Sequence, residues 1–308
     1  MRVCSLLPSA TEIAFALGLG DEVGGVTHEC DYPPQAKGKP VIVHSAVDSS
    51  RLSSSEIDHQ VAELLRAGKN LYTIDDEAFT AAAPDVILTQ GLCEVCALDY
   101  NDVVKASRRL PGKPTIVSLI PHCLADVLDD IVRVGAATQR HREAETLVLK
   151  LKRRIEEVRD CAKHPSSFPR VACIEWFDPI YAAGHWVPEM VNLAGGNDGL
   201  GLKNEPSAKI LWAEVREFQP EILVLMPCGF DVQRATQESK LLEKLEGWNE
   251  IPAVKAGNVF AVNGHAYFSR PGPRLVDGLE ILAQIVHPEI FPWNPPPGAV
   301  HRMFRPRR

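Results

Sequence analysis

The stretch VCSLLPSATEIAFALGLGDEVGGVTHECDYP (residues 3–33) decides the fold of this chain, because it contains a complete strand–helix–strand unit. The run RVCSLL (2–7) is short and apolar, which is typical of a strand buried in a parallel sheet. The run EVGGVT (22–27) is the next expected strand. Two such strands separated by a helix predict a parallel α/β sheet.

The helix between these two strands has recognisable start and stop signals. Pro8 and Ser9 open it, with Ser9 as the expected N-cap and Glu12 at capping-box spacing. It is expected to stop near Gly18 and Gly20.

The same alternation continues along the first part of the chain. A helix is expected over 53–68, and further strands over 85–90 and 115–120. Residues 124–160 then carry helical apolar spacing over many turns without a proline. Gly135 leaves open whether this stretch is one long helix or two shorter ones.

The second part of the chain repeats the scheme. Its expected elements are strands over 170–176, 221–227 and 258–264, with helices over 187–195, 231–248 and 273–286. Residues 288–308 contain six prolines and are expected to form an irregular tail.

These patterns predict an α/β protein with two Rossmann-like lobes. Each lobe has a central, mostly parallel sheet, and a long helical spine joins the lobes. The expected boundaries are an N-terminal lobe over 1–122, a spine over 123–163, a C-terminal lobe over 164–287 and a Pro/Arg-rich tail over 288–308.

Charge and composition narrow the class of partner. The 308 residues carry a formal net charge of -7, and 45% of them are hydrophobic. A nucleic-acid partner is disfavoured, because binding phosphates needs a basic face. No stretch approaches the roughly 20 apolar residues of a membrane helix, so no membrane insertion is expected.

The N-terminus lacks the pattern of a secretion signal. MRVCSLL breaks at once into PSATE, and no apolar run followed by a cleavage site precedes the first strand. A cytoplasmic location is therefore expected, or a periplasmic one if the sequence is a trimmed form. Free thiols are the expected state of the eight cysteines.

Four segments together resemble the cobalamin-binding and iron-complex-binding proteins of ABC importers. They are residues 3–33, YAAGHWVPEMVNLAGG (181–196), PSAKILWAEVREFQPEILVL (206–225) and GNVFAVNGHAYFSRPGPRLVDGLEIL (257–282). The resemblance implies a periplasmic-binding-protein fold of the helical-spine type. It also implies a ligand that lies flat in a cleft between the lobes and is contacted by loops at the carboxyl ends of strands.

The resemblance extends to single positions, and it has departures. Tyr181 matches an aromatic contact position of the family, and Arg270 matches an arginine that contacts the ligand. HECDYP (28–33) and TQGLCEVCALDY (89–100) stand where the transporter proteins typically have aromatic residues. These motifs indicate a subgroup for which the family's ligand binding is a firmer expectation than its role in transport.

A corrinoid is a large ring edged by amides, so its site needs apolar or aromatic faces and a few polar groups. Trp186 could instead be a core residue, His28 could be structural, and Arg270 could form a salt bridge that fixes its loop. The full set of ligand-binding candidates is His28, Glu29, Gln90, Cys93, Cys96, Tyr181, His185, Trp186, Ser207, Cys228, Tyr267, Phe268 and Arg270.

Cys93 and Cys96 form a CxxC motif that has three interpretations. The two thiols line the cleft without further chemistry, ligate a metal, or form a redox disulfide. A tetrahedral metal site needs two further ligands, and His28 and Cys30 at the end of a neighbouring strand could supply them.

The function expected from all of this is corrinoid binding, with cobalamin as the ligand and a metal ion as a further candidate. The alternatives are a metal, haem or siderophore-iron carrier, and a chelatase-like or corrinoid-modifying enzyme. We expect no enzymatic activity, because no nucleophile elbow, HExxH or kinase signature is found in the sequence. The implied partners are an ABC permease or a corrinoid-using protein.

Overall fold

The computed structural model describes residues 1–91, 98–165, 167–292 and 294–304. The chain divides into two compact units. Unit 1 comprises Met1–Leu52, Glu56–Pro121 and Ala125–Leu151, and unit 2 comprises Ser53–Ser55, His122–Leu124 and Lys152–Arg308. One boundary between the units falls inside helix α6 (His141–Cys161), so a continuous helix carries the chain from one to the other.

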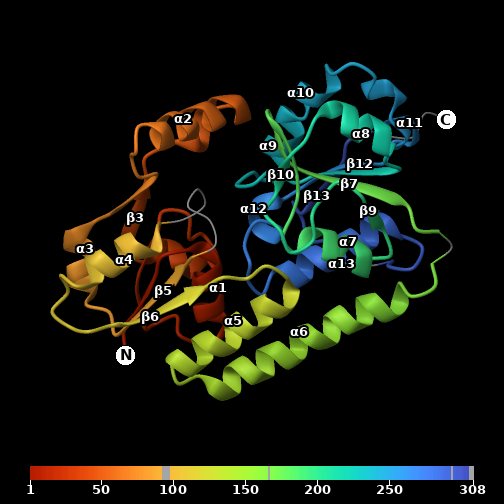
Figure 1. Cartoon of the computed structure of the whole chain (residues 1–308). Coiled ribbons are helices and arrows are strands. Elements are labelled where there is room, and N and C mark those ends of the chain that lie inside the picture. The colour runs from red at the N-terminus through yellow and green to blue at the C-terminus, as the bar shows by residue number, and fades with distance from the viewer. Residues whose placement is uncertain (92–97, 166, 293, 305–308) are drawn as a thin grey trace. The chain divides into compact units, whose positions relative to one another are not determined.

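Unit 1 is built on a six-stranded sheet in the order β4-β3-β2-β1-β5-β6 (Figure 1). All neighbouring pairs are parallel except β3 and β4. The strands are β1 (Val3–Ser5), β2 (Val23–Thr27), β3 (Val41–Ser45), β4 (Tyr72–Ile74), β5 (Val86–Gln90) and β6 (Thr115–Leu119).

Helices pack their apolar sides against this sheet. One core joins Ile42 and Ile87 of the strands to Phe79 of α3 and Val103 of α4. The helical elements that begin before the second sheet are α1 (Pro8–Ala16), η1 (Pro34–Gly38), η2 (Ser49–Arg51), α2 (Ser54–Arg66), α3 (Asp76–Ala82), α4 (Tyr100–Ser107), α5 (Leu124–Ala137) and α6.

The start of α1 differs from the sequence prediction. Leu7, with extended backbone, occupies the N-cap position, Pro8 is the first helical residue, and no side chain caps the helix. The prediction of Ser9 as N-cap is therefore wrong. Proline is favoured at the first helical position because its φ is preset and its missing N–H would be unpaired there in any case.

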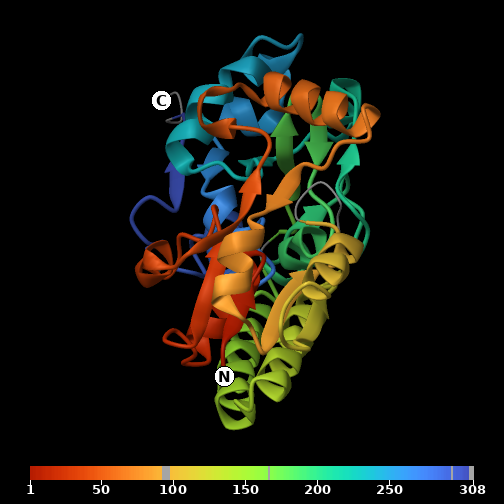
Figure 2. The ribbon, with the colours of Figure 1, turned by 90° about the vertical axis from the view of Figure 1, so that its left-hand side faces the viewer.

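The stretch expected to form the spine consists of two helices, α5 and α6. The break lies at Gln139, which has a φ of +59°, and not at Gly135, which stays inside α5. A Cβ at Gly135 would lie 2.5 Å from the Cβ of Ala144, so glycine lets α5 and α6 approach closely. The two helices lie side by side in Figures 1 and 2.

Unit 2 is built on a second sheet in the order β10-β8-β7-β11-β12-β13, with β9 also paired to β7. The pairs β7–β11, β11–β12 and β7–β9 are parallel, and the other pairs are antiparallel. The strands are β7 (Arg170–Phe177), β8 (Ile180–Ala182), β9 (Asn197–Asp198), β10 (Ala208–Lys209), β11 (Ile222–Leu225), β12 (Val259–Val262) and β13 (Val300–Arg302).

The helices of unit 2 are short except for the last. They are α7 (Val187–Leu193), α8 (Trp212–Phe218), α9 (Val232–Glu238), α10 (Lys240–Glu243), η3 (Trp248–Glu250), α11 (Pro252–Ala256), α12 (Gly264–Tyr267) and α13 (Leu275–Val286).

Two sequence expectations fail in unit 2. The single helix expected over 231–248 is divided at Ser239, whose hydroxyl donates to the carbonyl of Thr236 and so competes with the helical backbone bonds. The tail is not irregular throughout, because residues 300–302 pair with β12 as an antiparallel edge strand. Two sheets with flanking helices confirm the expected α/β class, but only the sheet of unit 1 is mostly parallel, since the sheet of unit 2 has as many antiparallel as parallel pairs.

The cysteines of the described residues are free thiols, as expected: Cys4, Cys30, Cys123, Cys161, Cys173 and Cys228. Burial raises the pKa of the Cys4 thiol to about 12 and that of Cys173 well above its ordinary value. No helix within the described part of the chain is long and apolar enough to cross a membrane.

Candidate functional site

The candidate residues of each unit follow the carboxyl ends of its parallel strands. In unit 1, His28 follows β2 and Gln90 ends β5. In unit 2, Cys228 follows β11 and His265 follows β12. Ligands of open α/β sheets bind outside the carboxyl ends of the strands, so the sheet topology marks these loops as a candidate binding surface in each unit.

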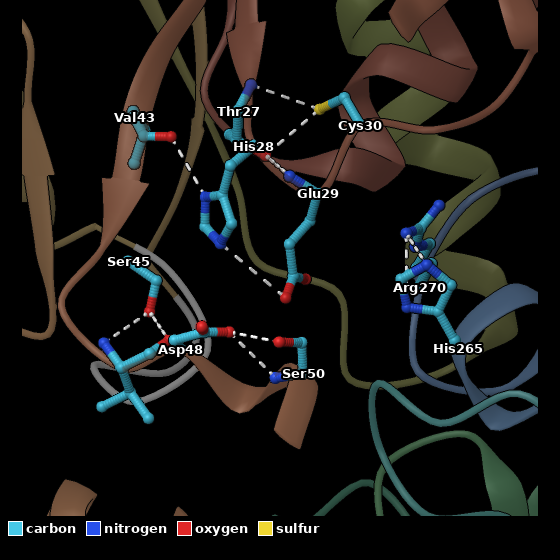
Figure 3. A network of polar contacts seen from close by, with 11 residues as sticks. Thr27, His28, Glu29, Cys30, Val43, Ser45, Asp48, Ser50, His265 and Arg270 are labelled. Atoms are coloured by element: carbon cyan, nitrogen blue, oxygen red, sulfur yellow. Dashed lines mark hydrogen bonds and ion pairs between the residues drawn. The ribbon is translucent and has the colours of Figure 1, made fainter. Parts of the chain in front are cut away.

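His28 is held by the neighbouring strand β3. Its backbone N–H donates to the carbonyl oxygen of Val43 at 3.0 Å, and its ring Nδ1 lies 3.1 Å from the same oxygen (Figure 3). Nε2 lies 3.9 Å from Oε1 of Glu29, which is longer than a hydrogen bond. The side chains of His28 and Glu29 are 30% and 46% exposed, so both remain accessible.

Cys30 is buried, and its thiol has local partners. The Sγ atom lies 3.0 Å from Oγ1 of Thr11 and 3.3 Å from Oγ1 of Thr27. Figure 3 shows the thiol turned toward Thr27 and the imidazole of His28 pointing away from it. Cys30 therefore contributes to the packing of this loop.

Of the four predicted metal ligands, the structure describes only His28 and Cys30. Cys93 and Cys96 lie outside the described residues, so their roles stay predictions. Among the residues that the structure describes, no group of three or more His, Cys, Asp or Glu side chains is placed to hold a metal ion.

Gln90 is the last residue of β5 and pairs in register with Leu119 of β6. Its side chain is buried, with 7% exposure. Strand β1 lies between β2 and β5 in the sheet, so the strand order reverses direction between β1 and β5. Gln90 thus lies at the topological switch point of unit 1, where ligands of such sheets are commonly found.

The hairpin formed by β7 and β8 carries an aromatic patch, which we define as Trp176, Tyr181 and Phe230. Tyr181 lies opposite Trp176 in the hairpin register, and the rings of Trp176 and Phe230 are 5.4 Å apart. The neighbours Ile180 and Ala182 belong to the core, so alternation along β8 turns Tyr181 to the other face of the sheet.

The guanidinium of Arg234 covers the outer end of this patch, with its Cζ 3.7 Å from the centroid of the Phe230 ring. Such an arrangement is a cation–π contact. Sequence reasoning missed Trp176, Phe230 and Arg234. The only sequence signal was that Trp176 and Phe230 stand near the ends of expected strands.

Ser207 and Cys228 meet at Glu175 of β7. The hydroxyl of Ser207 donates to Oε2 of Glu175 at 2.7 Å and accepts from the N–H of Gly184 at 3.1 Å. The backbone N–H of Cys228 donates to the Glu175 carbonyl oxygen at 3.1 Å. Ser207 therefore ties β10 to the hairpin, and the backbone of Cys228 is held against β7.

The loop after β12 is pressed against the end of β11. A Cβ at Gly264 would lie 2.5 Å from the carbonyl oxygen of Pro227, so only glycine fits there without displacement. Asn263 caps α12 by accepting from the N–H of Ala266 at 2.9 Å. The N–H of His265 donates to the carbonyl oxygen of Phe230 at 3.1 Å, which joins this loop to the aromatic patch.

Arg270 is buried, with 5% exposure, and its guanidinium donates to Nε2 of His265 (Figure 3). Because arginine is always charged and only donates, Nε2 must be unprotonated and Nδ1 carries the proton of the neutral ring. His265 therefore orients the arginine, a role that sequence reasoning missed although the two residues stand five apart in GHAYFSR.

Trp186 and Phe268 are buried residues that support the loop carrying Arg270. Both are buried, and the indole N–H of Trp186 donates to the carbonyl oxygen of Phe268 at 2.8 Å. Tyr267 is partly exposed, and Arg274 lies 5.7 Å from the centroid of its ring. The sequence alternative in which Trp186 is a core residue agrees with this placement, and Tyr267 stays accessible.

His185 lies beside Trp186 in a strained backbone conformation, with a φ of +53°. Its ring stacks on that of Trp186 at 5.3 Å and lies 6.4 Å from the ring of His122. Burial and, secondarily, the charge of His122 lower the pKa of His185, so its neutral form is favoured. Nδ1 of His185 is buried without a hydrogen-bond partner among the described residues.

The chain is similar over most of its length to known binding proteins. The chain is 27% identical over 295 residues to an uncharacterized ABC transporter substrate-binding lipoprotein, YvrC, of Bacillus subtilis, covering 94% of this chain and 81% of that protein. It is 25% identical over 288 residues to the vitamin B12-binding protein of Vibrio cholerae, covering 91% and 86%.

Solved structures share the fold. The periplasmic heme-binding protein RhuT from Roseiflexus sp. RS-1 matches with a TM-score of 0.70 at 21% identity, covering 94% of this chain and 98% of that one. The vitamin B12-binding protein BtuF of Vibrio cholerae matches with a TM-score of 0.66 at 21% identity, covering 95% and 98%.

A family model described as periplasmic binding protein matches residues 3–265. Since that match spans most of the chain, this protein belongs to the periplasmic binding protein family.

Proposed function

We propose that this chain is a non-enzymatic binding protein for a corrinoid, with cobalamin as the ligand. The observation that carries the proposal is Arg270, a buried guanidinium that His265 holds in a loop contiguous with the aromatic patch. The loops at the carboxyl ends of the unit 2 strands form the principal binding surface.

The chemistry of these residues suits a flat ring edged by amides. Trp176, Tyr181 and Tyr267 offer aromatic surface to the ring. Arg270 offers a planar fork of donors that matches amide carbonyls or a phosphate. Such a combination of apolar faces with few oriented polar groups is typical of small-molecule sites.

The names of two relatives support both the proposed ligand and its transfer to a recipient. One relative is named a vitamin B12-binding protein, and another is named a substrate-binding lipoprotein of an ABC transporter. We propose that this chain likewise hands its ligand to a recipient, either an ABC permease or a corrinoid-using protein.

Calorimetric titration tests the ligand directly. The purified chain is titrated with cobalamin, cobinamide, haem and a ferric hydroxamate siderophore. We expect corrinoids to bind most tightly and the siderophore not to bind. Tighter binding of the siderophore, or no binding of either corrinoid, would refute the proposal.

Two variants test the location of the site. Arg270→Ala and Tyr181→Ala should each weaken cobalamin binding by about 1–3 kcal/mol, as is usual for contact residues. Arg153→Ala and Phe168→Ala are the controls, because both side chains are exposed, on α6 and just before the amino end of β7. Unchanged affinity in both test variants would place the site elsewhere.

Haem is the second candidate ligand. It is favoured by the imidazoles of His185 and His122 in unit 2, whose ring centroids lie 6.4 Å apart and which are suited to iron. The same calorimetric series ranks haem against the corrinoids, and a stronger affinity for haem would replace cobalamin in the proposal.

A metal ion held by the CxxC motif is a separate possibility that metal analysis resolves. If Cys93 and Cys96 ligate zinc or iron, the purified protein should contain the metal stoichiometrically. A Cys93→Ser/Cys96→Ser variant should then lose the metal while remaining folded. Absence of metal from the unaltered protein would leave these thiols either as lining residues or as a redox disulfide.

A further inference from the structure

A pocket of about 250 Å³ lies between α8 and η3 of unit 2. It is found at the amino end of the second sheet, because the carbonyl oxygen of its lining residue Gln219 accepts a hydrogen bond of 2.9 Å from Nε of Arg170, the first residue of β7. Strand β11 likewise begins shortly after Gln219, at Ile222. The candidate binding loops of unit 2 follow the carboxyl ends of the same strands, so this pocket is separate from them.

The backbone at Gly247 holds the guanidinium of Arg216 in place. Gly247 has a φ of +76°, and a Cβ built on it would lie 2.6 Å from Nε and 2.9 Å from Cζ of Arg216. Only glycine combines this backbone conformation with so close an approach. One face of the guanidinium is therefore covered by the fold, and its plane is fixed before any ligand arrives.

The N–H groups of Arg216 remain available to a ligand. Oε2 of Glu250 lies 3.7 Å from Nη2, which is longer than a hydrogen bond. In the part of the chain that the structure describes, Glu250 is the charged partner of Arg216, and no acceptor is within hydrogen-bonding distance of the guanidinium. The Arg216 side chain is 38% exposed and lines the pocket, so its fork of donors faces the space where a ligand would lie.

The remaining lining combines negative charge with apolar surface. Glu217 and Glu250 bring two carboxylates beside the single guanidinium, and Ala213 and the buried Ile251 supply apolar contact. A simple anion is disfavoured because the carboxylates outnumber the guanidinium. A simple cation leaves the donors of the arginine unused. A zwitterion matches both signs, with its carboxylate on the guanidinium and its cationic group on the carboxylates.

We propose that this pocket binds a free α-amino acid with an aliphatic side chain. The amino acid's carboxylate accepts hydrogen bonds from Arg216, its ammonium group donates to Glu250 and Glu217, and its side chain covers Ala213 and Ile251. The volume fits such a ligand, because sites for drug-sized molecules usually measure about 300–1,000 Å³ and this pocket is smaller. The inference goes beyond the proposed function and does not depend on it.

Titration of the full-length protein with leucine, followed by saturation-transfer NMR of the ligand, tests the proposal. Isopentylamine is leucine without its carboxylate, and isocaproate is leucine without its ammonium group. We expect leucine to bind with a dissociation constant of about 1 mM or below, as suits a small ligand in an open pocket. Each analogue should bind about tenfold more weakly, because each leaves one sign of charge in the pocket unmatched.

The variants are Arg216→Gln and Glu250→Gln, with Arg153→Gln as the matched control. Arg153 is also an exposed arginine paired with a glutamate, but it lies on α6. Both pocket variants should weaken leucine binding about tenfold, and the control should not. Arg216→Gln should remove the preference for leucine over isopentylamine, whereas Glu250→Gln should reduce the preference for leucine over isocaproate. The Glu250 side chain is 70% exposed, so its replacement tests the pocket without threatening the fold.

Three results would overturn the inference. They are no binding of leucine at about 10 mM, equal binding of leucine and either analogue to the unaltered protein, and leucine binding that neither pocket variant changes. Calorimetry with cobalamin is a separate readout. Arg216→Gln should bind cobalamin as the unaltered protein does, and failure of the unaltered protein to bind a corrinoid would refute the proposed function whatever the leucine result.

Discussion

The indole N–H of Trp186 donates a hydrogen bond of 2.8 Å to the carbonyl oxygen of Phe268, which lies 82 residues further along the chain. Trp186 stands at the start of α7, and Phe268 stands two residues before Arg270. Both residues are buried. Trp186, which the sequence suggests as a contact to the ligand ring, therefore supports the loop that carries Arg270.

Replacing Trp186 by Phe should weaken both the fold and the site. The change removes the donor and leaves the Phe268 carbonyl buried without this partner, which costs about 1–3 kcal/mol of the free energy of unfolding. Ligand affinity should fall as well, because the loop that carries Arg270 loses its support. Chemical denaturation and calorimetric titration measure the two effects.

The control for this variant is Trp212→Phe. The indole of Trp212 donates to the carbonyl of Glu246 at 2.8 Å, away from the arginine loop. It should lower stability without changing affinity. Equal loss of affinity in both variants would show that the effect is general destabilisation.

His265 should act on the ligand through Arg270. His265→Ala removes the acceptor that orients the guanidinium, so we expect ligand affinity to fall by about 1–2 kcal/mol. His265→Gln offers an amide oxygen in place of Nε2 and should recover most of the loss. Titration calorimetry on the two variants checks this, and a Gln variant as weak as the Ala variant would contradict the positioning role.

Cys30 should matter for stability and not for ligand binding. Its thiol is enclosed by Thr11 and Thr27, so Cys30→Ala removes a buried partner and should lower the free energy of unfolding by about 1–2 kcal/mol. Cys30→Ser keeps a hydrogen-bonding group and should lose less. If Cys30→Ala instead abolished a bound metal or weakened the ligand, the thiol would belong to the site.

Asp130 should make stability depend on pH. The side chain is almost fully buried in α5, and burial raises its pKa to about 6 from 3.8 despite the charge of Arg133. Between these two values the folded state binds more protons than the unfolded state. The contribution of Asp130 to stability is therefore greatest at low pH and is lost as pH rises through about 6.

An Asp130→Asn variant removes this titration. Relative to the unaltered protein, it should be more stable at about pH 7.5 than at about pH 5, by about 1 kcal/mol after allowance for the half-exposed Arg133. Urea denaturation at the two pH values measures the difference. A stability difference that is independent of pH would show that Asp130 is ionised in the folded state throughout.

Local sequence patterns were enough to predict the longer buried elements. Strands β1, β2, β5, β6, β7, β11 and β12 all fall within or close to the predicted runs, because continuous apolar runs bounded by turns indicate buried parallel strands. Strand β3 was missed although it has five residues, and so were the short elements. Strand β4 has three residues, none of them fully buried, and β9 and β10 have two residues each, so they carry too little pattern to recognise.

The hydrophobic pattern of the sequence did not by itself indicate where helices break or begin. The spine breaks at Gln139 and not at the glycine, because Gly135 serves the contact with Ala144. That contact exists only once the two helices have packed. The start of α1 at Pro8 follows a preference of the backbone that outweighed the side-chain cap expected at Ser9.

By itself, the sequence determined the α/β class, the two sheets, and the placement of His28, Gln90 and Cys228 at strand ends, because these follow from local hydrophobic periodicity. Only the tertiary structure decided which of these side chains are accessible and how they are oriented. The partners of His28, Cys30 and Arg270 are Val43, Thr11 and His265, and those of Trp186 and Trp176 are Phe268 and Phe230. Most of these pairs join separate elements, and the orientation of a buried polar group depends on whichever partner the fold brings within hydrogen-bonding distance.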